Sequence, residues 1–285
     1  MLKRVQHVSG EVMALSNNTL RVIVSIFAIP VIVAASYFGN LFFLILILLI
    51  ALSSYYEFCL LVKNKEMYPN LWVGLVAVAF LVINQSIPFW NIYSFILLLV
   101  VLLTLIELFR NKGSAIFNLS STLLGVFYIG LFSNAIIAIR EFYPNVGNLY
   151  LQGGYLIISI LAAIWICDSA AYYGGTALGK HKLFPRVSPK KSWEGALFGF
   201  IFAVITMVLA KIIVLDFLSW NTTILLGIII GTIGQIGDLV ESLLKRDAGV
   251  KDSSNIIPGH GGVFDRFDSL LYSAPVILLY LRYLG

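Results

Sequence analysis

Most of the side chains that could do chemistry in this 285-residue chain gather in two polar stretches, residues 168–194 and 238–268. Four aspartates lie at or near the ends of these stretches: Asp168, Asp238, Asp265 and Asp268. Carboxylate oxygens are the usual protein ligands of Mg²⁺, whereas zinc sites are built mainly from Cys and His. The lysines and arginines of the same stretches could bind phosphate groups. Together these residues predict a site for a phosphate compound bound with Mg²⁺.

The first polar stretch contains Ser188, Lys190 and Lys191 shortly before an apolar run that predicts a helix. Adjacent lysines beside hydroxyl groups at the start of a helix suit a phosphate ligand. In the alternative interpretation, these basic residues only contact lipid headgroups and fix the topology. That alternative explains the positive charge, but it does not explain Asp168 at the end of an apolar segment.

The second polar stretch begins inside an apolar segment. Asp238, Glu241, Ser242 and Lys245 are spaced i, i+3, i+4 and i+7, so they share one face of a helix. Such a face is costly against lipid and should therefore border a cavity. In the alternative interpretation, the charges neutralise one another at the membrane surface.

A glycine-rich loop and two acids complete this stretch. In the run Gly259-His260-Gly261-Gly262, three glycines allow backbone N–H groups to approach an anion closely. Asp265 and Asp268 follow at the predicted start of the last helix. One of them could cap that helix, but a cap needs only one acid.

The whole chain is too apolar for a soluble domain. It is 60% hydrophobic and 12% charged, whereas soluble domains carry about 25% charged residues, and its mean hydropathy is +0.94. This composition excludes a secreted disulfide scaffold, a disordered chain and a soluble nucleic-acid binder. Cys59 and Cys167 lie in apolar runs, where packing inside helices is expected. Because the apolar runs are continuous and do not alternate, the chain is predicted to be an all-α polytopic membrane protein.

Nine apolar segments approach the length needed to cross a bilayer, which is about 20 residues. They are Leu20–Phe38, Asn40–Val62, Leu71–Ile87, Phe89–Phe109, Ala115–Ile139, Tyr150–Cys167, Gly195–Leu215, Thr222–Glu241 and Phe267–Leu284. With a cytoplasmic N-terminus and an outside C-terminus, sixteen of the 19 basic residues lie on the cytoplasmic side, as the positive-inside rule requires. We therefore expect a multi-pass protein of the cell (inner) membrane whose active site faces the cytoplasm.

The segments divide the chain into three regions: a cytoplasmic tail (1–19), an N-terminal transmembrane region of five helices (20–148) and a C-terminal catalytic transmembrane region of four helices (149–285). Both polar stretches belong to the third region, and the topology should bring the four aspartates to one membrane face. Glu57 and Glu107 also lie at cytoplasmic helix ends. Neither is assigned a role, and Glu107 could pair with Arg110 at i, i+3.

The second stretch closely resembles the signature of the phosphatidate cytidylyltransferases, the CDP-diacylglycerol synthases. The matching run is Ser242-x2-Lys245-Arg246-x4-Lys251-Asp252-x5-Pro258-Gly259-His260-Gly261-Gly262-x2-Asp265-Arg266-x-Asp268. Upstream, the runs similar to the second motif of that family are Asp168-Ser169-Ala170, Gly179-Lys180-His181 and Ser188-Pro189-Lys190-Lys191-Ser192-Trp193-Glu194-Gly195. The recognisable resemblance covers about residues 165–270. The first 150 residues resemble the family only as a hydrophobic multi-span region.

The resemblance implies that the protein makes CDP-diacylglycerol and pyrophosphate from CTP and phosphatidate, with Mg²⁺, in phospholipid biosynthesis. The implied partners are CTP, phosphatidate and membrane lipid, and no nucleic acid. Formation of a homodimer and the identity of a second cation are left open. The lipid phosphate is largely ionised near neutral pH, so it can attack the α-phosphorus of CTP without a dedicated base.

Roles for individual residues also follow from the resemblance. The implied metal ligands are Asp238, Asp265 and Asp268. The implied catalytic residues, which would hold the triphosphate or shape its loop, are Lys245, Arg246, Lys251, His260 and Arg266. The implied substrate-binding residues are Asp168, Ser188, Lys190, Lys191, Ser242, Gly259, Gly261 and Gly262.

Two other functions remain as alternatives. A CTP-dependent polyprenol or phytol kinase would transfer the γ-phosphate and release CDP instead of pyrophosphate. A transporter or channel, which belongs to a different class, would use the acids as an ion path. That second alternative predicts charges distributed through the depth of the bilayer, whereas here they are predicted to gather at one face.

Overall fold

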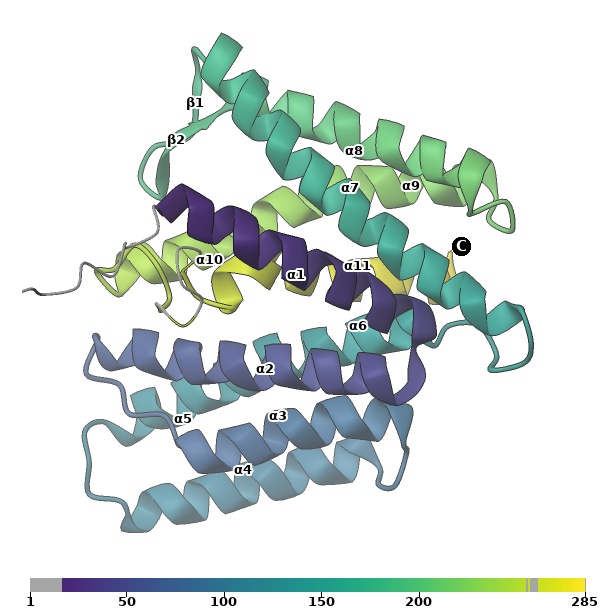
Figure 1. The fold of residues 1–285 in the computed structure, drawn as a ribbon. Coiled ribbons are helices and arrows are strands. Elements are labelled where there is room, and N and C mark those ends of the chain that lie inside the picture. Colours follow the sequence, from purple (N-terminus) through teal and green to yellow (C-terminus); the bar gives the residue numbers. More distant parts are fainter. Residues whose placement is uncertain (1–16, 255, 257–260, 285) are drawn as a thin grey trace, which may run out of the picture.

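The computed structural model describes residues 17–254, 256 and 261–284, and most of them are helical (Figure 1). The helices are α1 (Asn17–Phe38), α2 (Asn40–Lys63), α3 (Leu71–Ser86), α4 (Ile92–Phe109), α5 (Ala115–Gly125), α6 (Phe132–Arg140), α7 (Leu149–Leu178), α8 (Trp193–Ile213), α9 (Trp220–Ile229), α10 (Gln235–Asp247) and α11 (Phe264–Tyr283). Two π-helical turns, η1 (Val126–Leu131) and η2 (Ile230–Gly234), join α5 to α6 and α9 to α10. The start of α1 and the end of α11 lie at opposite ends of the bundle (Figure 1).

Six helices in the described part of the chain could cross a membrane by length and composition. They are Asn40–Lys63, Ile92–Phe109, Ala115–Arg140, Leu149–Leu178, Trp193–Ile213 and Trp220–Asp247. Val24–Phe38 and Leu71–Ser86 are apolar but shorter, and α11 carries Asp265, Arg266 and Asp268 near its start. An all-α polytopic membrane protein is therefore confirmed, whereas the count of nine spans and the direction of the termini stay predictions.

Several helix starts are fixed by side chains from the sequence itself. Asn70, Asn91, Ser192 and Ser219 each precede a helix and accept a hydrogen bond from a backbone N–H of its first turn. Such caps satisfy N–H groups that have no partner inside the helix. Cap and apolar run together explain why α3, α4, α8 and α9 begin where they do.

A buried arginine fixes the end of the bundle opposite the polar stretches. Arg140 is fully buried, and it donates hydrogen bonds to the carbonyls of Ser36 (2.6 Å), Tyr37 (2.9 Å) and Tyr150 (3.0 Å). Gly39, between α1 and α2, has a φ of +67°, and a Cβ there would lie 2.3 Å from the Arg140 guanidinium. Arg140 therefore joins the end of α1 to the start of α7.

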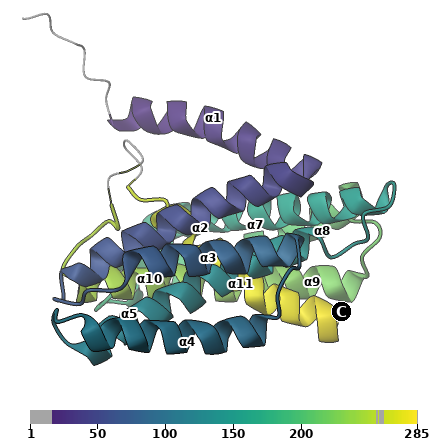
Figure 2. The ribbon, with the colours of Figure 1, turned by 90° about the horizontal axis from the view of Figure 1, so that it is seen from below.

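The N-terminal helices pack directly against the C-terminal ones. α2 and α6 contact α11, and α1 lies at the margin of the bundle against α2 and α7 (Figure 2). The ring of Tyr128 in η1 meets Phe264 and Tyr272 of α11 edge-on, at centroid distances of 5.8 Å and 6.1 Å. Lys65 after α2 forms an ion pair of 3.4 Å with Asp247 at the end of α10. The first turn of α11 is thus braced from the N-terminal region.

Two features of the first polar stretch differ from the sequence-based expectation. α7 continues to Leu178, so the predicted end of this segment at Cys167 was wrong and Asp168 lies inside a helix. The extension packs on α8 at Gly174, where the ring of Phe198 occupies the space beside the backbone. A Cβ at Gly174 would lie only 2.6 Å from that ring. The remaining residues form an antiparallel hairpin of β1 (Lys182–Phe184) and β2 (Ser188–Ser192). This hairpin was not predicted, because its residues do not alternate between polar and apolar.

Candidate active site

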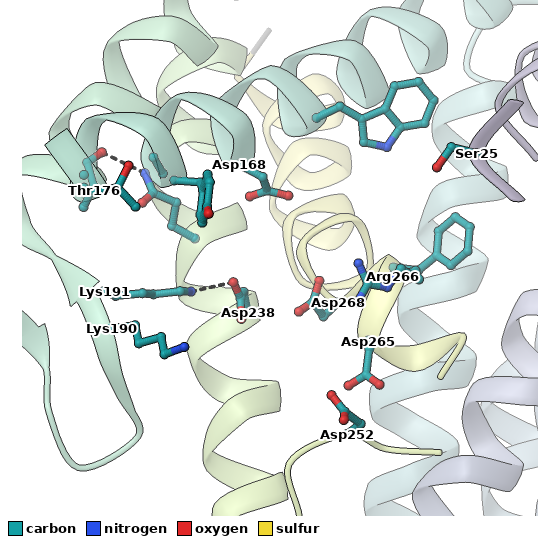
Figure 3. A pocket seen from close by; sticks show the side chains of 18 of the residues that line it. Ser25, Asp168, Thr176, Lys190, Lys191, Asp238, Asp252, Asp265, Arg266 and Asp268 are labelled. Atoms are coloured by element: carbon teal, nitrogen blue, oxygen red, sulfur yellow. Dashed lines mark hydrogen bonds and ion pairs between the residues drawn. The ribbon is translucent and has the colours of Figure 1, made fainter. Parts of the chain in front are cut away.

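A cavity of about 710 Å³ opens among α1, α7, β2, α8, α10 and α11. All four of the predicted aspartates line it: Asp168, Asp238, Asp265 and Asp268 (Figure 3). They come from three helices, α7, α10 and α11. The first and last of these aspartates, Asp168 and Asp268, are 100 residues apart in the sequence. The structure therefore brings together the acids that topology alone suggested would meet.

The hairpin supplies the lysines of the cavity. Lys190 and Lys191 extend from β2 into it (Figure 3). The ammonium of Lys191 lies 2.5 Å from Asp238 Oδ2, and Ser242 donates a hydrogen bond of 3.3 Å to the other oxygen of the same carboxylate. Asp238 is thus held by one neighbour on its own helix and one on the hairpin.

Glu194 attaches the hairpin to the start of α8. Its carboxylate accepts hydrogen bonds from the backbone N–H groups of Lys180 (3.1 Å) and His181 (3.2 Å) and lies 2.7 Å from His181 Nδ1. Ser192, the last residue of β2, accepts a hydrogen bond from Gly195 N–H and so caps α8. Both contacts hold the base of the hairpin, so the strand that carries Lys190 and Lys191 is anchored at its last residue.

Three carboxylates converge at the wall of the cavity, where Asp238 and Asp268 line it and Glu241 is buried beside them. One oxygen from each of Asp238, Glu241 and Asp268 lies within 4.8 Å of the others. Glu241 is fully buried, and its Oε1 has no hydrogen-bond partner among the described residues. Its Oε2 lies 2.5 Å from the ammonium of Lys245, which also lies 2.7 Å from Asp265 Oδ1. One lysine therefore balances two acids, and the cluster keeps an excess of negative charge.

The π-helical turn η2 sets the direction in which α10 presents these acids. Such turns occur mostly as single insertions within α-helices and are frequent at functional sites. Gln235, the first residue of α10, donates hydrogen bonds to the carbonyls of Gly231 (2.6 Å) and Ala196 (3.0 Å). It therefore stabilises the turn and ties it to α8, next to the part of α10 from which Asp238 faces the cavity.

Asp265 is held by a loop as well as by Lys245. Its carboxylate accepts hydrogen bonds from the backbone N–H groups of Gly262 (2.8 Å) and Ser253 (3.0 Å) and lies 3.0 Å from the Ser253 hydroxyl oxygen. Gly261 has a φ of +84°, a conformation that favours glycine. Part of the predicted glycine-rich loop thus supports Asp265, while Gly259 and His260 lie outside the described residues.

Several predicted residues do not line the cavity. Arg266 lines the cavity, but Arg246 does not. Arg246 instead donates hydrogen bonds to the carbonyls of Val187 (3.3 Å) and Val250 (3.0 Å). The other described residues of the predicted site that are absent from the lining are Ser188, Ser242, Lys251, Gly261 and Gly262. Arg246 and Ser242 therefore support neighbouring groups in this structure.

Two acids outside the predicted set of site residues, Glu241 and Glu57, contact groups of the site. Glu241 belongs to the carboxylate cluster, and its place on one helix face with Asp238 was the signal for it. Glu57 is fully buried in α2 and bonded to residues around the start of α11; no local sequence signal pointed to this contact. Glu107 lies 3.5 Å from Arg110, which confirms the pairing considered for it.

Part of the cavity wall is apolar. Val24, Ala28, Ile29 and Ile32 of α1 face the acids and lysines across the cavity. A cavity with a charged side and an aliphatic side suits an amphiphilic molecule with an ionic headgroup.

The donor set fits a divalent cation with oxygen ligands. Three carboxylates lie together, and the buried one, Glu241, shares Lys245 with Asp265. Carboxylates that lie close together repel one another, and a bound cation would offset that repulsion. All-oxygen ligands fit Mg²⁺ better than zinc.

Comparison with known proteins connects this site to an activity. Residues 19–284 match the sequence profile of the cytidylyltransferase family. The chain is 32% identical to the phosphatidate cytidylyltransferase of Synechocystis sp., over 91% of this chain and 94% of that relative. It is 35% identical to the phosphatidate cytidylyltransferase of Staphylococcus haemolyticus, over 73% of this chain and 77% of that one. The enzyme of the same name from Bacillus subtilis is 40% identical over 54% of this chain and 55% of its own.

Proposed function

Because this chain belongs to the cytidylyltransferase family, we propose that it is a phosphatidate cytidylyltransferase, which makes CDP-diacylglycerol and pyrophosphate from CTP and phosphatidate. The observation that carries this proposal is the amphiphilic cavity. Its charged side, with Lys190 and Lys191, suits phosphate groups, and its aliphatic side, from α1, suits the apolar part of a lipid. A nucleoside triphosphate and a phospholipid together need both sides.

The reaction needs no group to remove a proton. An oxygen of the lipid phosphate forms a bond to the α-phosphorus of CTP, and the bond from that phosphorus to the bridging oxygen of the β-phosphate breaks. The electron pair of the broken bond leaves with pyrophosphate. Since the attacking phosphate is already ionised, the obstacle is repulsion between anions and the charge that grows on the leaving group.

The basic residues of the cavity meet this need. Lys190, Lys191 and Arg266 point fixed positive charge toward the space that the phosphates would fill (Figure 3). Lys245 lies deeper, between two acids. In a partly enclosed cavity such charges stabilise the transition state more strongly than in water. Among the remaining predicted residues, Lys251 is proposed to bind the triphosphate, whereas Arg246 is proposed to hold the hairpin and the loop after α10 through the carbonyls of Val187 and Val250.

Asp238, Glu241 and Asp268 are the proposed holders of Mg²⁺, with Asp265 as a fourth carboxylate beside them. When bound, Mg²⁺ would neutralise charge on the triphosphate and orient it. The described residues contribute the rest: Lys191 positions Asp238, and Lys245 joins Glu241 to Asp265. Asp168 faces the same space from α7 and is proposed to border the substrate.

The proposed arrangement in the membrane has nine spans, a cytoplasmic N-terminus and an outside C-terminus, in the cell (inner) membrane. It is supported by the sixteen-to-three division of basic residues and by the start of α1 and the end of α11, which lie at opposite ends of the bundle (Figure 1). The cavity then faces the cytoplasm, which contains CTP. Residues 20–148 are proposed as the N-terminal transmembrane region and 149–285 as the catalytic one. A homodimer is compatible with this arrangement.

A direct assay tests the proposal. The purified protein in lipid nanodiscs receives CTP, Mg²⁺ and phosphatidate, and pyrophosphate and CDP-diacylglycerol are both measured. Equal amounts of the two products, formed only when phosphatidate is present, are expected. Formation of CDP with a polyprenol or phytol acceptor would show a kinase instead. Ion uptake into vesicles without turnover of CTP would show a transporter.

A further inference from the structure

Glu57 lies in α2, in the N-terminal region, and is fully buried. Its Oε1 accepts hydrogen bonds from the Ser254 hydroxyl (2.7 Å) and from Val263 N–H (2.8 Å). Its Oε2 accepts one from Phe264 N–H (2.8 Å) and lies 2.9 Å from the Ser253 hydroxyl oxygen. All of these partners belong to the second polar stretch. A buried carboxylate is tolerated only with such a full set of partners.

Glu57 of α2 caps α11 by accepting hydrogen bonds from the backbone N–H groups of Val263 and Phe264. The first N–H groups of a helix have no partner within it, and the helix dipole favours negative charge at this end. Val263, which precedes α11, makes no side-chain cap hydrogen bond. Glu57 therefore supplies the anionic acceptor for these N–H groups.

Glu57 is also in close contact with the group that holds Asp265. The hydroxyl oxygen of Ser253 lies between the two carboxylates, 2.9 Å from Glu57 and 3.0 Å from Asp265. A Cβ on Gly262 would lie 1.9 Å from that hydroxyl and 2.4 Å from Glu57 Oε2. Gly262 therefore has no room for a side chain, and Ser253 links Glu57 directly to Asp265.

We propose that Glu57 is a positioning residue for cytidylyl transfer: it holds residues 253–254 and the first turn of α11, so that Asp265 and Asp268 face the cavity. Glu57 does not line the cavity, so it acts through these groups and not on the substrate. The inference rests on the proposed function. It gives the N-terminal region a defined part in the site, in addition to packing.

The first experiment measures the loop itself, in protein without metal or nucleotide. Glu57→Gln replaces two acceptor oxygens by one oxygen and an amide group that donates. Hydrogen exchange at the backbone amides of residues 262–264 should become roughly tenfold faster, equivalent to the loss of one charge-assisted hydrogen bond. Glu107→Gln is the matched control, because Glu107 is also buried at a helix end but is bonded to Arg110 and Asn118. It should leave exchange at residues 262–264 unchanged.

The second experiment measures catalysis as a function of Mg²⁺ concentration. In Glu57→Gln, kcat should fall at least roughly tenfold, and the Mg²⁺ concentration for half-maximal rate should rise. Ser254→Ala removes one of the hydroxyl partners and should cause a smaller change in the same direction. If Glu57 only supported folding, the fraction of active protein would fall while the Mg²⁺ dependence stayed unchanged.

Two outcomes would overturn the inference: wild-type exchange and Mg²⁺ dependence in Glu57→Gln, or equal changes in Glu107→Gln. Failure of the proposed function looks different. In that case the wild-type protein would not release pyrophosphate from CTP and phosphatidate, and the exchange experiment would still show whether Glu57 holds the loop.

Discussion

Lys191 of β2 and Asp238 of α10 form an ion pair of 2.5 Å across the cavity. About a third of each side chain is exposed, 30% for Lys191 and 34% for Asp238. An ion pair as exposed as this one contributes little to stability, about 0–1 kcal/mol. Its importance lies in placement: it brings a cation of the hairpin against the carboxylate cluster, where a phosphate and a metal would meet.

Lys191→Ala should therefore impair catalysis much more than folding. Loss of one preorganised charge at a transition state costs about 10²-fold or more in kcat, whereas the unfolding temperature should change little. Steady-state kinetics with CTP and phosphatidate, together with thermal unfolding, measure both effects. Lys65→Ala is the control, because the ion pair of Lys65 with Asp247 is also exposed. Equal rates for Lys191→Ala and Lys65→Ala would remove Lys191 from the site.

Asp265→Ala should abolish turnover while the protein still inserts into the membrane and folds. The substitution removes the partner of Lys245, Ser253 and Gly262, so it alters both the charge of the cavity and the start of α11. Turnover and yield of folded protein are measured in parallel with Asp247→Ala, an exposed acid of α10. Near-normal turnover in Asp265→Ala would contradict its proposed role.

Removal of divalent cations should stop the reaction without unfolding the protein. With excess chelator, pyrophosphate release should cease, and added Mg²⁺ should restore it. Glu241→Gln should raise the Mg²⁺ concentration for half-maximal rate, because it removes one negative charge from the three-carboxylate cluster. Turnover that persists in chelator, or an unchanged Mg²⁺ dependence in Glu241→Gln, would count against a metal at this cluster.

Arg140→Met should destabilise the fold. It leaves three carbonyls without their donor, those of Ser36, Tyr37 and Tyr150, and each buried group left unpaired costs about 1–3 kcal/mol. Thermal unfolding in detergent should show a clear fall in the unfolding temperature, while the KM for CTP stays unchanged because the cavity lies at the other end. The exposed Arg282 offers the control Arg282→Met. A similar fall for both variants would show that the burial of Arg140 is unimportant.

The helices and the main acids of the site could be predicted from local patterns. Apolar runs of membrane length and the spacing of Asp238, Glu241 and Lys245 depend only on neighbouring residues, and both patterns persist in the structure. The end of α7 and the hairpin could not be predicted in this way. The last turns of α7 pack on α8 at Gly174. The hairpin is bound to the start of α8 by the hydrogen bonds of Glu194 and Ser192.

The sequence by itself determined a membrane protein of helices with acids and bases gathered in two stretches, because composition and helical spacing are local properties. Only the tertiary structure decided which groups touch. Lys245 lies between Glu241 and Asp265, and Glu57 holds the start of α11 across a separation of about 200 residues. Contacts at such separations depend on how helices pack, and no local pattern encodes them.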